Sequence, residues 1–299
     1  MKNLELMSGQ MVKHVTRKFI SDALISAGLK DARIVEISPG NKPILSKSNF
    51  PALLYVDYFD TEGVKKNNED RYGYKPKDLQ SVDIALSLDP EMSVLEDASV
   101  KAVTSSHVFE HLPNPIKHLK IVERILDERG IYVLIVPDKR ACFDVFRHPT
   151  DIGEWVFSYH QNTEKPLFSQ HFNSHSRAVF DSVGGIHKQH SHSVYSQRTQ
   201  QSDFSFPIQQ VLEDSLRDAA KQLASSFYGD CHCSVFTPPS LHLLLVETNL
   251  LGLTSFWPIQ RSGVLGEEFV IILQKGAGDG MSGVEKKKIR FELCQEVFL

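Results

Sequence analysis

The chain has 299 residues, of which 41% are hydrophobic and 23% are charged, a composition typical of a globular protein with room for a full α/β core. Its formal net charge of −4 supplies no overall basic field to neutralise a phosphate backbone, so nucleic acid is not expected as a partner. The first residues lack the basic and apolar regions of an export signal, and the longest apolar run, LHLLLVETNLLGL, is interrupted by polar side chains. We therefore expect a cytoplasmic protein without a membrane span.

The four cysteines give no sign of a metal or disulfide framework. Cys142, Cys231, Cys233 and Cys294 form no C-x-x-C pair, and the C-x-C spacing of Cys231 and Cys233 does not suit a zinc ribbon. Reduced thiols are expected at all four positions.

The first half of the chain reads as one helix followed by five strands. An amphipathic helix is predicted over residues 10–28, with Gly28 as a suitable C-cap. Five short runs rich in β-branched residues follow: ARIVEIS, LLYVDYF, SVDIALSL, VKAVTSS and GIYVLIVP. The runs are continuous rather than alternating, as in parallel strands that are buried on both faces. Between the last two, a helix is predicted from the cap Asn114 and Pro115 to Gly130, which completes a strand–helix–strand unit. Such units build a doubly wound, mostly parallel sheet.

From His148 to about Asp230 the pattern gives way to a polar and aromatic insertion that holds seven of the 13 histidines. One helix is predicted inside it, from Pro207 to about Ser226. The run HKQHSH lacks an acidic or cysteine partner at a recognisable spacing, so no metal site is predicted and a solvated loop is favoured.

The last third returns to the α/β pattern. A helix capped by Thr237 and opened by Pro238 precedes two closing strands, LTSFWPIQ and EEFVIILQ, then a Gly-rich linker and a final short strand. The predicted organisation is a cofactor-binding core over residues 1–148, an insertion over 149–235 that forms the acceptor site, closing elements of the core over 236–275, and a linker and tail over 276–299.

Ligands of open parallel sheets bind beyond the carboxyl ends of the strands. The loop after the first strand, EISPGNKP, has one glycine rather than G-x-G-x-x-G, which argues against NAD and for a nucleoside ligand without a phosphate. Asp57 ends the second strand about 20 residues further on, where a carboxylate can bond a ribose diol. The alternative is an aspartate that only stabilises a turn.

Five segments resemble the class I S-adenosylmethionine-dependent methyltransferases: EISPGNKP, YVDYFDTEG, SSHVFEHLPNP, VPDKR and CHCSVFTP. The resemblance covers Ala32 to Lys139 and resumes from CHCSVFTPPS to FVIILQ, and it is greatest for a bacterial branch associated with cell-surface glycan synthesis. EISPG departs from the commoner E-x-G-x-G of that family. The resemblance implies a Rossmann-like, seven-stranded sheet whose last strand is antiparallel, with S-adenosyl-L-methionine as cofactor.

The resemblance also implies roles for cofactor-binding residues. Glu36, Ser38 and Gly40 would contact the amino-acid end of the cofactor, and Asp57 its ribose. Asp89 corresponds to the acidic position near the adenine, although Asp83 competes for this role.

The segment SSHVFEH follows the fourth strand, which places Ser106 and His107 beneath the reactive methyl group and Glu110 and His111 at the rim of the same crevice. A hydroxyl acceptor needs a proton acceptor, and a histidine with a near-neutral pKa suits that role. His107 or His111 is therefore a candidate base or cofactor-positioning residue. Alternatively, Glu110 and His111 only cap the next helix.

Other candidates lie near the acceptor. His232 is a second candidate base, with a buried histidine bonded to backbone as the alternative. Asp138 and Arg140 follow the fifth strand at the same edge, where Asp138 either lines the acceptor site or forms an ion pair that fixes the insertion. Four residues of the insertion are candidate contacts of a ring-shaped acceptor: Tyr159, His160, His171 and Phe172.

These observations predict a methyltransferase that methylates a hydroxyl of a glycan or nucleotide sugar. A nicotinamide-dependent oxidoreductase or epimerase is disfavoured by the missing G-x-G-x-x-G and by the lack of a Y-x-x-x-K pair after the fourth strand. A non-catalytic binding module would be favoured by loss of Glu36 or Asp57, and both are present. The acceptor atom and the oligomeric state stay open.

Overall fold

A seven-stranded sheet forms the centre of the protein, whose computed structural model describes residues 12–40, 42–72, 79–178, 180–183, 186–189, 208–225 and 228–299. The strands stand in the order β3 (Ile84–Ala85), β2 (Leu53–Asp57), β1 (Ile34–Ile37), β4 (Val100–Ser106), β5 (Leu126–Pro137), β9 (Glu268–Lys275) and β8 (Phe256–Arg261). Neighbours from β3 to β5 are parallel, whereas β9 is antiparallel to both β5 and β8. The predicted doubly wound sheet with one reversed strand is therefore confirmed.

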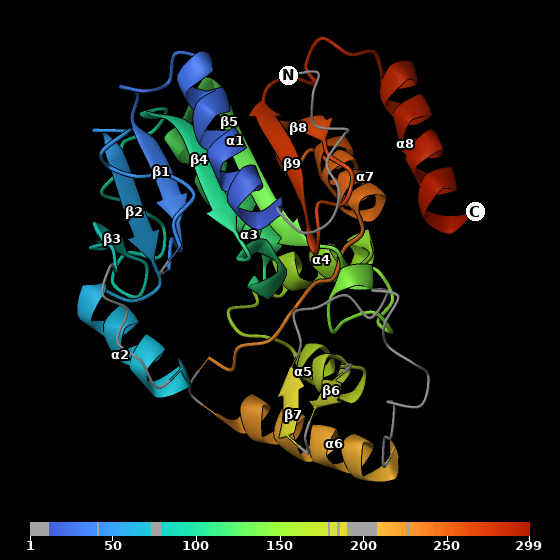
Figure 1. Ribbon diagram of the computed structural model, residues 1–299. Coiled ribbons are helices and arrows are strands. Elements are labelled where there is room, and N and C mark those ends of the chain that lie inside the picture. Colours follow the sequence, from blue (N-terminus) through green and yellow to red (C-terminus); the bar gives the residue numbers. More distant parts are fainter. Residues whose placement is uncertain are drawn as a thin grey trace.

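Helices cover both faces of this sheet (Figure 1). Successive side chains of a strand point to opposite faces, so a strand that is apolar throughout needs a cover on each side. On one face, Ile20 and Leu24 of α1 (Val12–Ser26) pack against Ile34 and Tyr55. Three helices contribute to the core on the other face: α3 (Pro115–Ile125), α4 (Ile152–His160) and α7 (Pro238–Leu250). A further helix, α2 (Thr61–Tyr72), follows β2.

The start of α3 agrees with the prediction, but its end does not. The Asn114 side chain accepts a hydrogen bond from the backbone N–H of Lys117 at 3.0 Å, and Pro115 is the first helical residue. The helix ends at Ile125 rather than at Gly130, because Leu126 is extended, fully buried and paired with Val100 at the start of β5. Burial of an apolar side chain against the sheet thus outweighs the helix-stop signal of the glycine.

The C-terminal segment is a helix, so the predicted linker and strand are wrong there. The helix α8 (Gly283–Phe298) begins with a capping box formed by Ser282 and Glu285. Ile289, Leu293 and Val297 recur at a spacing of four residues and pack in one cluster with α7. This four-residue spacing is the helical signal that the sequence analysis missed.

The insertion over residues 149–235 contains more helix than predicted. The predicted helix is present as α6 (Ile208–Ala224), but α4, α5 (Phe168–Ser176) and a hairpin of β6 (Phe180–Val183) and β7 (Ile186–Gln189) are added. The capping box of Asp151 and Glu154 marks the start of α4 and was overlooked. In Figure 1, α5, α6 and the hairpin form a lobe beyond the carboxyl ends of β1 and β4. We call this group the acceptor-side lobe.

Two expectations about the whole chain can be compared with the structure. The four cysteines are free thiols, as predicted. In the part of the chain that the structure describes, no helix has the length and apolar character needed to cross a membrane.

The loop after β1 is folded around the buried carboxylate of Glu36. One carboxylate oxygen accepts a hydrogen bond from the N–H of Ile44 at 2.6 Å, and the other accepts one from Leu45 at 2.9 Å. Burial raises the pKa of Glu36 to about 7, although these two bonds and the nearby charge of Arg17 oppose the rise. The carboxylate therefore holds the loop against the end of β1.

Because the pKa of Glu36 rises from 4.5 to about 7, folding takes up a proton in this pH range. The free energy of unfolding should then fall as the pH rises from about 4.5 to about 7, since the native state binds more protons than the unfolded chain. Glu36→Gln should lose about 1–3 kcal/mol of stability at low pH, and its deficit should shrink as the pH rises. Urea unfolding at about pH 5 and about pH 8 measures this. A deficit that grows with pH, or equals that of the exposed control Glu62→Gln, would contradict the assignment.

Candidate functional site

The predicted site residues lie at the carboxyl edge of the sheet. The strand order reverses between β1 and β4, which both leave the sheet at this edge, and such a switch point is where ligands of open α/β sheets bind. The acceptor-side lobe stands opposite this edge (Figure 1).

After β1 the backbone turns through two left-handed residues, Ser38 with φ 50° and Gly40 with φ 53°. Among the described residues, no heavy atom beyond Gly40 and its chain neighbours lies within 4 Å of the position that a Cβ of Gly40 would take, so a ligand can approach this backbone closely. The carboxylate of Glu36 instead bonds its own loop. The structure therefore gives Glu36 the role of shaping the loop, while Gly40 presents the open face.

Asp57 lies at the end of β2, next to this loop. Its carboxylate accepts hydrogen bonds from the backbone of Phe59 and Tyr58 and from the side chain of Ser38. Burial raises the pKa of Asp57, and these three bonds counteract the rise. Asp57 and Ser38, which the resemblance placed at different ends of the cofactor, are thus in direct contact.

The two candidate carboxylates near the adenine end are both engaged in local structure. Asp89 accepts hydrogen bonds from the backbone and hydroxyl of Ser93 and from the backbone of Val94, which lower its pKa. Asp83 forms an ion pair with Lys47 at 2.7 Å and accepts the N–H of Tyr55 at 2.7 Å. Both side chains stabilise turns at the sheet edge.

Ser106 ends β4 and meets α1. Arg17 of α1 donates a hydrogen bond to the Ser106 hydroxyl at 3.4 Å, and its charge also acts on Glu36. Arg17 therefore brings a cation to the point where β1 and β4 diverge. The sequence analysis did not identify it, because the helix and the strand ends are distant in sequence.

His107 lies between two buried carboxylates. Its Nε2 is 2.9 Å from Glu268, and its Nδ1 is 3.5 Å from Glu110. Burial lowers its pKa, but contacts with Glu110 and Glu268 outweigh burial and raise the pKa to about 9. Its left-handed backbone, with φ 55°, turns the chain sharply after β4. A histidine that is protonated at neutral pH has no lone pair to accept a proton, so His107 suits electrostatic positioning better than the role of base.

Glu110 and His111 form a short 3-10 helix (Phe109–His111) that is bonded along its backbone to the segment before α7. The Ser234 N–H donates to the Glu110 carbonyl at 3.0 Å, and the Tyr228 hydroxyl donates to the His111 carbonyl at 2.6 Å. The Cys233 thiol lies 3.2 Å from the same carbonyl. These bonds place His232 beside His111.

Each of these histidines is held by an aspartate through Nδ1. His111 Nδ1 is 2.7 Å from Asp230, and His232 Nδ1 is 2.5 Å from Asp144. Asp144 is fully buried and also accepts from Arg147 at 2.9 Å, and contacts with His232 and Arg147 keep its pKa low in spite of burial. With Nδ1 occupied, each ring presents Nε2.

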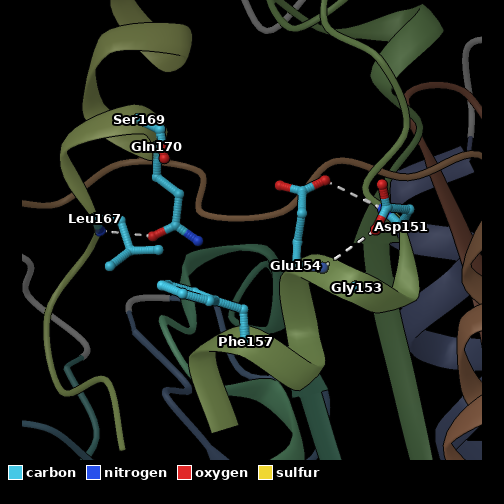
Figure 2. Close-up of a pocket in the computed structure, with 7 residues that line it drawn as sticks. All are labelled: Asp151, Gly153, Glu154, Phe157, Leu167, Ser169 and Gln170. Atoms are coloured by element: carbon cyan, nitrogen blue, oxygen red, sulfur yellow. Dashed lines mark hydrogen bonds between the residues drawn. The ribbon is translucent and has the colours of Figure 1, made fainter. Parts of the chain in front are cut away.

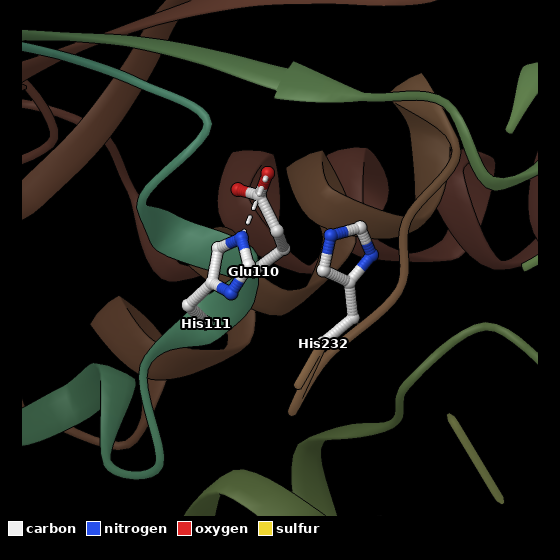
Figure 3. A group of neighbouring side chains, drawn as sticks. All are labelled: Glu110, His111 and His232. Carbon is white, nitrogen blue, oxygen red and sulfur yellow. Dashed lines mark ion pairs between the residues drawn. The ribbon is translucent and has the colours of Figure 1, made fainter. Parts of the chain in front are cut away.

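The two imidazole rings meet over Glu110. Their centroids are 4.7 Å apart at 89°, and Figure 3 shows both rings with a nitrogen turned toward the Glu110 carboxylate. Glu110 is 1% exposed, and among the described residues neither of its carboxylate oxygens has a hydrogen-bond partner. Burial by itself would raise the pKa of Glu110, but the contact with His107 and the charges of the neighbouring histidines outweigh burial. The pKa of Glu110 is therefore below its ordinary value, and the carboxylate is ionised. We call Glu110, His111 and His232 the edge cluster.

The remaining candidates lie apart from the edge cluster. Asp138 is buried and forms an ion pair with Arg140, two residues further on, at 2.6 Å. The other four residues belong to α4 and α5, where Tyr159 packs on the core, His160 is exposed, His171 is buried and Phe172 stacks on Phe168. The group His187, His190 and His192 cannot be placed, because the last two lie outside the described residues and the side chain of His187 is not described.

A hollow lies between α4 and α5, away from the edge cluster (Figure 2). It encloses about 370 Å³ and is lined by residues of these helices and their N-terminal turns: Asp151, Gly153, Glu154, Phe157, Leu167, Ser169 and Gln170. The acidic pair at one end, Asp151 and Glu154, is used in the capping box. None of the predicted site residues lines this hollow.

The sequence analysis missed the carboxylates that orient the histidines. Asp144 and Asp230 stand at no recognisable spacing from His232 and His111, and the second pair is 119 residues apart. Glu268 opens the reversed strand β9 and reaches His107 from 161 residues away. The sequence contained one local hint of a carboxylate near these histidines: in DCHC, Asp230 stands two residues before His232, although it contacts His111.

The chain is similar to known proteins over part of its length. A family described as "Methyltransferase domain" matches residues 61–134. No curated protein matches the chain.

Several solved structures are similar at low sequence identity. A SAM-dependent methyltransferase from Aquifex aeolicus is 10% identical, with 87% of this chain and 97% of that chain covered and a TM-score of 0.38. The PH0226 protein from Pyrococcus horikoshii OT3 is 11% identical, with coverages of 92% and 96% and a TM-score of 0.40. The CurJ carbon methyltransferase is 13% identical, with a TM-score of 0.39, and this chain, covered to 88%, spans only 54% of that chain.

The match over residues 61–134 includes α2, β3, β4 and α3, and it therefore contains Ser106, His107 and Glu110 but not Glu36 or Asp57. The sheet order, with its single reversed strand, is that of the class I methyltransferase fold. Residues 61–134 of the chain are therefore similar to a methyltransferase domain, and they lie within a seven-stranded sheet of this order.

Proposed function

We propose that the protein methylates a hydroxyl group of a sugar-type acceptor that binds between the edge cluster and the acceptor-side lobe. The observation that carries this proposal is the edge cluster itself, in which two aspartate-oriented histidines turn Nε2 toward one buried carboxylate. S-adenosylmethionine supplies an electrophilic methyl group. A neutral hydroxyl is a weak nucleophile, so the chain has to activate and orient it.

The sheet edge has the groups that the cofactor requires. Asp57 offers a carboxylate for the ribose diol, the open backbone at Gly40 allows close approach, and Arg17 places a cation at the branch between β1 and β4 where a carboxylate can bind. We assign the amino-acid end of the cofactor to Arg17 and the loop at Ser38, and the ribose to Asp57. Glu36 acts through the loop that it folds.

The acceptor side of the site combines imidazole nitrogens that carry a lone pair with exposed aromatic rings. His232 has its tautomer fixed by Asp144, which leaves Nε2 to act on the acceptor hydroxyl, and His111 supports it from the adjoining position. Tyr58 and Tyr228 lie with their ring centroids 6.4 Å apart and are 50% and 38% exposed. Exposed aromatic rings beside a polar cluster suit a polyhydroxylated ring, which has apolar faces and a polar rim.

The class of acceptor can be tested directly. Transfer of a labelled methyl group from S-adenosylmethionine should be detected with nucleotide sugars or free glycans, and it should need a free hydroxyl. Matched acceptors in which that hydroxyl is replaced by hydrogen should be inactive. Transfer to amines or carbon acids alone would refute the proposed acceptor class, while leaving the methyltransferase assignment in place.

Asp57→Asn should weaken binding of S-adenosylhomocysteine by about 1–3 kcal/mol, because the charge-assisted bonds to the ribose are lost. The amide oxygen can still accept from Ser38, so the loop should keep its conformation. Calorimetric titration measures the change. The exposed Asp60→Asn, three residues further on, is the matched control and should bind normally. Equal affinity in both variants would remove Asp57 from the cofactor site.

His232→Gln should lower kcat about a hundredfold or more, because the lone pair directed at the acceptor is lost. Its affinity for S-adenosylhomocysteine should stay within about twofold, since the cofactor residues lie on β1, β2 and α1. The exposed His148→Gln is the control and should turn over normally. Unchanged kcat in His232→Gln would move the activating group elsewhere in the site.

A further inference from the structure

We propose that the edge cluster is a binding site for one divalent transition-metal ion, with Glu110, His111 Nε2 and His232 Nε2 as ligands. One ligand atom from each of the three residues lies within 4.8 Å of the others. In a tetrahedral site with bonds of about 2.0–2.1 Å, ligand atoms stand about 3.4 Å apart, so closure requires shifts of about 1 Å. His111 Nε2 is already 3.9 Å from Glu110 Oε1.

The first independent support is the state of Glu110. Its carboxylate is 1% exposed, and both oxygens lack a hydrogen-bond partner within the described part of the chain. A buried carboxylate without hydrogen bonds is costly to maintain. The nearest groups are imidazole nitrogens at 3.5 Å and 3.9 Å, which lie beyond hydrogen-bond length. A cation between the carboxylate and the two Nε2 atoms would satisfy it.

The second support is the pair of aspartates behind the histidines. Asp230 and Asp144 each contact the Nδ1 of one ring, at 2.7 Å and 2.5 Å. Metal-ligating histidines characteristically donate their other N–H to a carboxylate, which fixes the ring and raises its basicity. Both ligand histidines of the edge cluster have this arrangement, although they come from different segments.

The local charge also favours a cation. Three carboxylates contact the rings of the edge cluster, those of Glu110, Asp144 and Asp230, and Glu268 lies behind His107. The positive charges nearby are those of Arg147, His107 and Lys139, whose ammonium group donates to the Val145 carbonyl. With both ligand histidines neutral, the contacting groups leave an excess of negative charge that a divalent ion would balance.

Two imidazoles and one carboxylate suit zinc, cobalt, manganese or ferrous iron better than magnesium or calcium, which prefer oxygen ligands alone. His111 is 29% exposed at its side chain, so the remaining coordination positions can face the crevice. This role rests on the proposed function: an ion here would bind the acceptor hydroxyl and lower its pKa, so that the hydroxyl would release its proton to water in the crevice as its oxygen takes the methyl group and S-adenosylhomocysteine leaves. The histidines would then act on the acceptor through the metal.

Binding can be measured without activity. The full chain, freed of metal by chelation, is titrated with Co²⁺ while the visible d–d bands are followed, and Zn²⁺ is then added in competition. One Co²⁺ per chain should bind with a tetrahedral or five-coordinate spectrum that Zn²⁺ abolishes. Glu110→Gln and His232→Gln should each weaken binding at least tenfold, and Asp144→Asn should weaken it about 10–100-fold.

A control separates this site from the histidine-rich segment. The triple variant His187→Ala, His190→Ala and His192→Ala should keep the spectrum and the affinity. Circular dichroism and binding of S-adenosylhomocysteine verify that each variant is folded. Absence of the bands in the wild-type chain, bands that survive in both Glu110→Gln and His232→Gln, or bands lost in the triple variant would overturn the metal site.

Turnover distinguishes this inference from the proposed function. If the metal-free enzyme methylates its acceptor at full rate while His232→Gln is inactive, the ion has no role in turnover, so the claim that it activates the acceptor fails while the proposed function stands; the Co²⁺ titration alone decides whether the binding site exists. If Co²⁺ binds as expected but no hydroxyl acceptor is methylated, the metal site stands and the proposed function fails.

Discussion

The geometry of the edge cluster depends on hydrogen bonds to backbone carbonyls, which join two segments that are far apart in the sequence. The short helix after β4 carries Glu110 and His111, and the segment before α7 is bonded to it through the Ser234 N–H and the Tyr228 hydroxyl. Because the bonds are made by backbone carbonyls, they fix the positions of the side chains on both segments. Together with the bond from Arg147 to the His232 carbonyl, they hold His232 beside His111.

Buried charge is the second constraint on this edge. The site concentrates Glu110, Glu268 and Asp144 in the protein interior, where an unpaired carboxylate would cost several kcal/mol. His107 and Arg147 neutralise part of this charge: each lies three residues from one carboxylate that it contacts, and His107 also contacts the distant Glu268. The same charges that make the site costly to fold allow it to orient imidazole rings, which is a common relation between stability and function at active sites.

Much of the fold could be predicted from local patterns. The continuous apolar strands, the Asn114–Pro115 helix start and the paired closing strands all correspond to observed elements, because a strand that is buried on both faces leaves the same composition wherever it lies in the sheet. The predictions failed where tertiary contacts outweighed a local signal. Leu126 begins a strand before the expected glycine stop, and the tail becomes α8 because its apolar residues find a partner surface on α7.

The sequence by itself determined the sheet, the position of Asp57 at a strand end and the presence of histidines after β4 and before α7, since each depends on residues close together in the chain. Only the tertiary structure decided how these residues interact. It showed that Glu36 shapes a loop, that His107 is held as a cation, and that His111 and His232 share one carboxylate. The last two roles depend on distances between residues separated by more than a hundred positions, and such distances follow from the packing of the whole chain rather than from any local pattern.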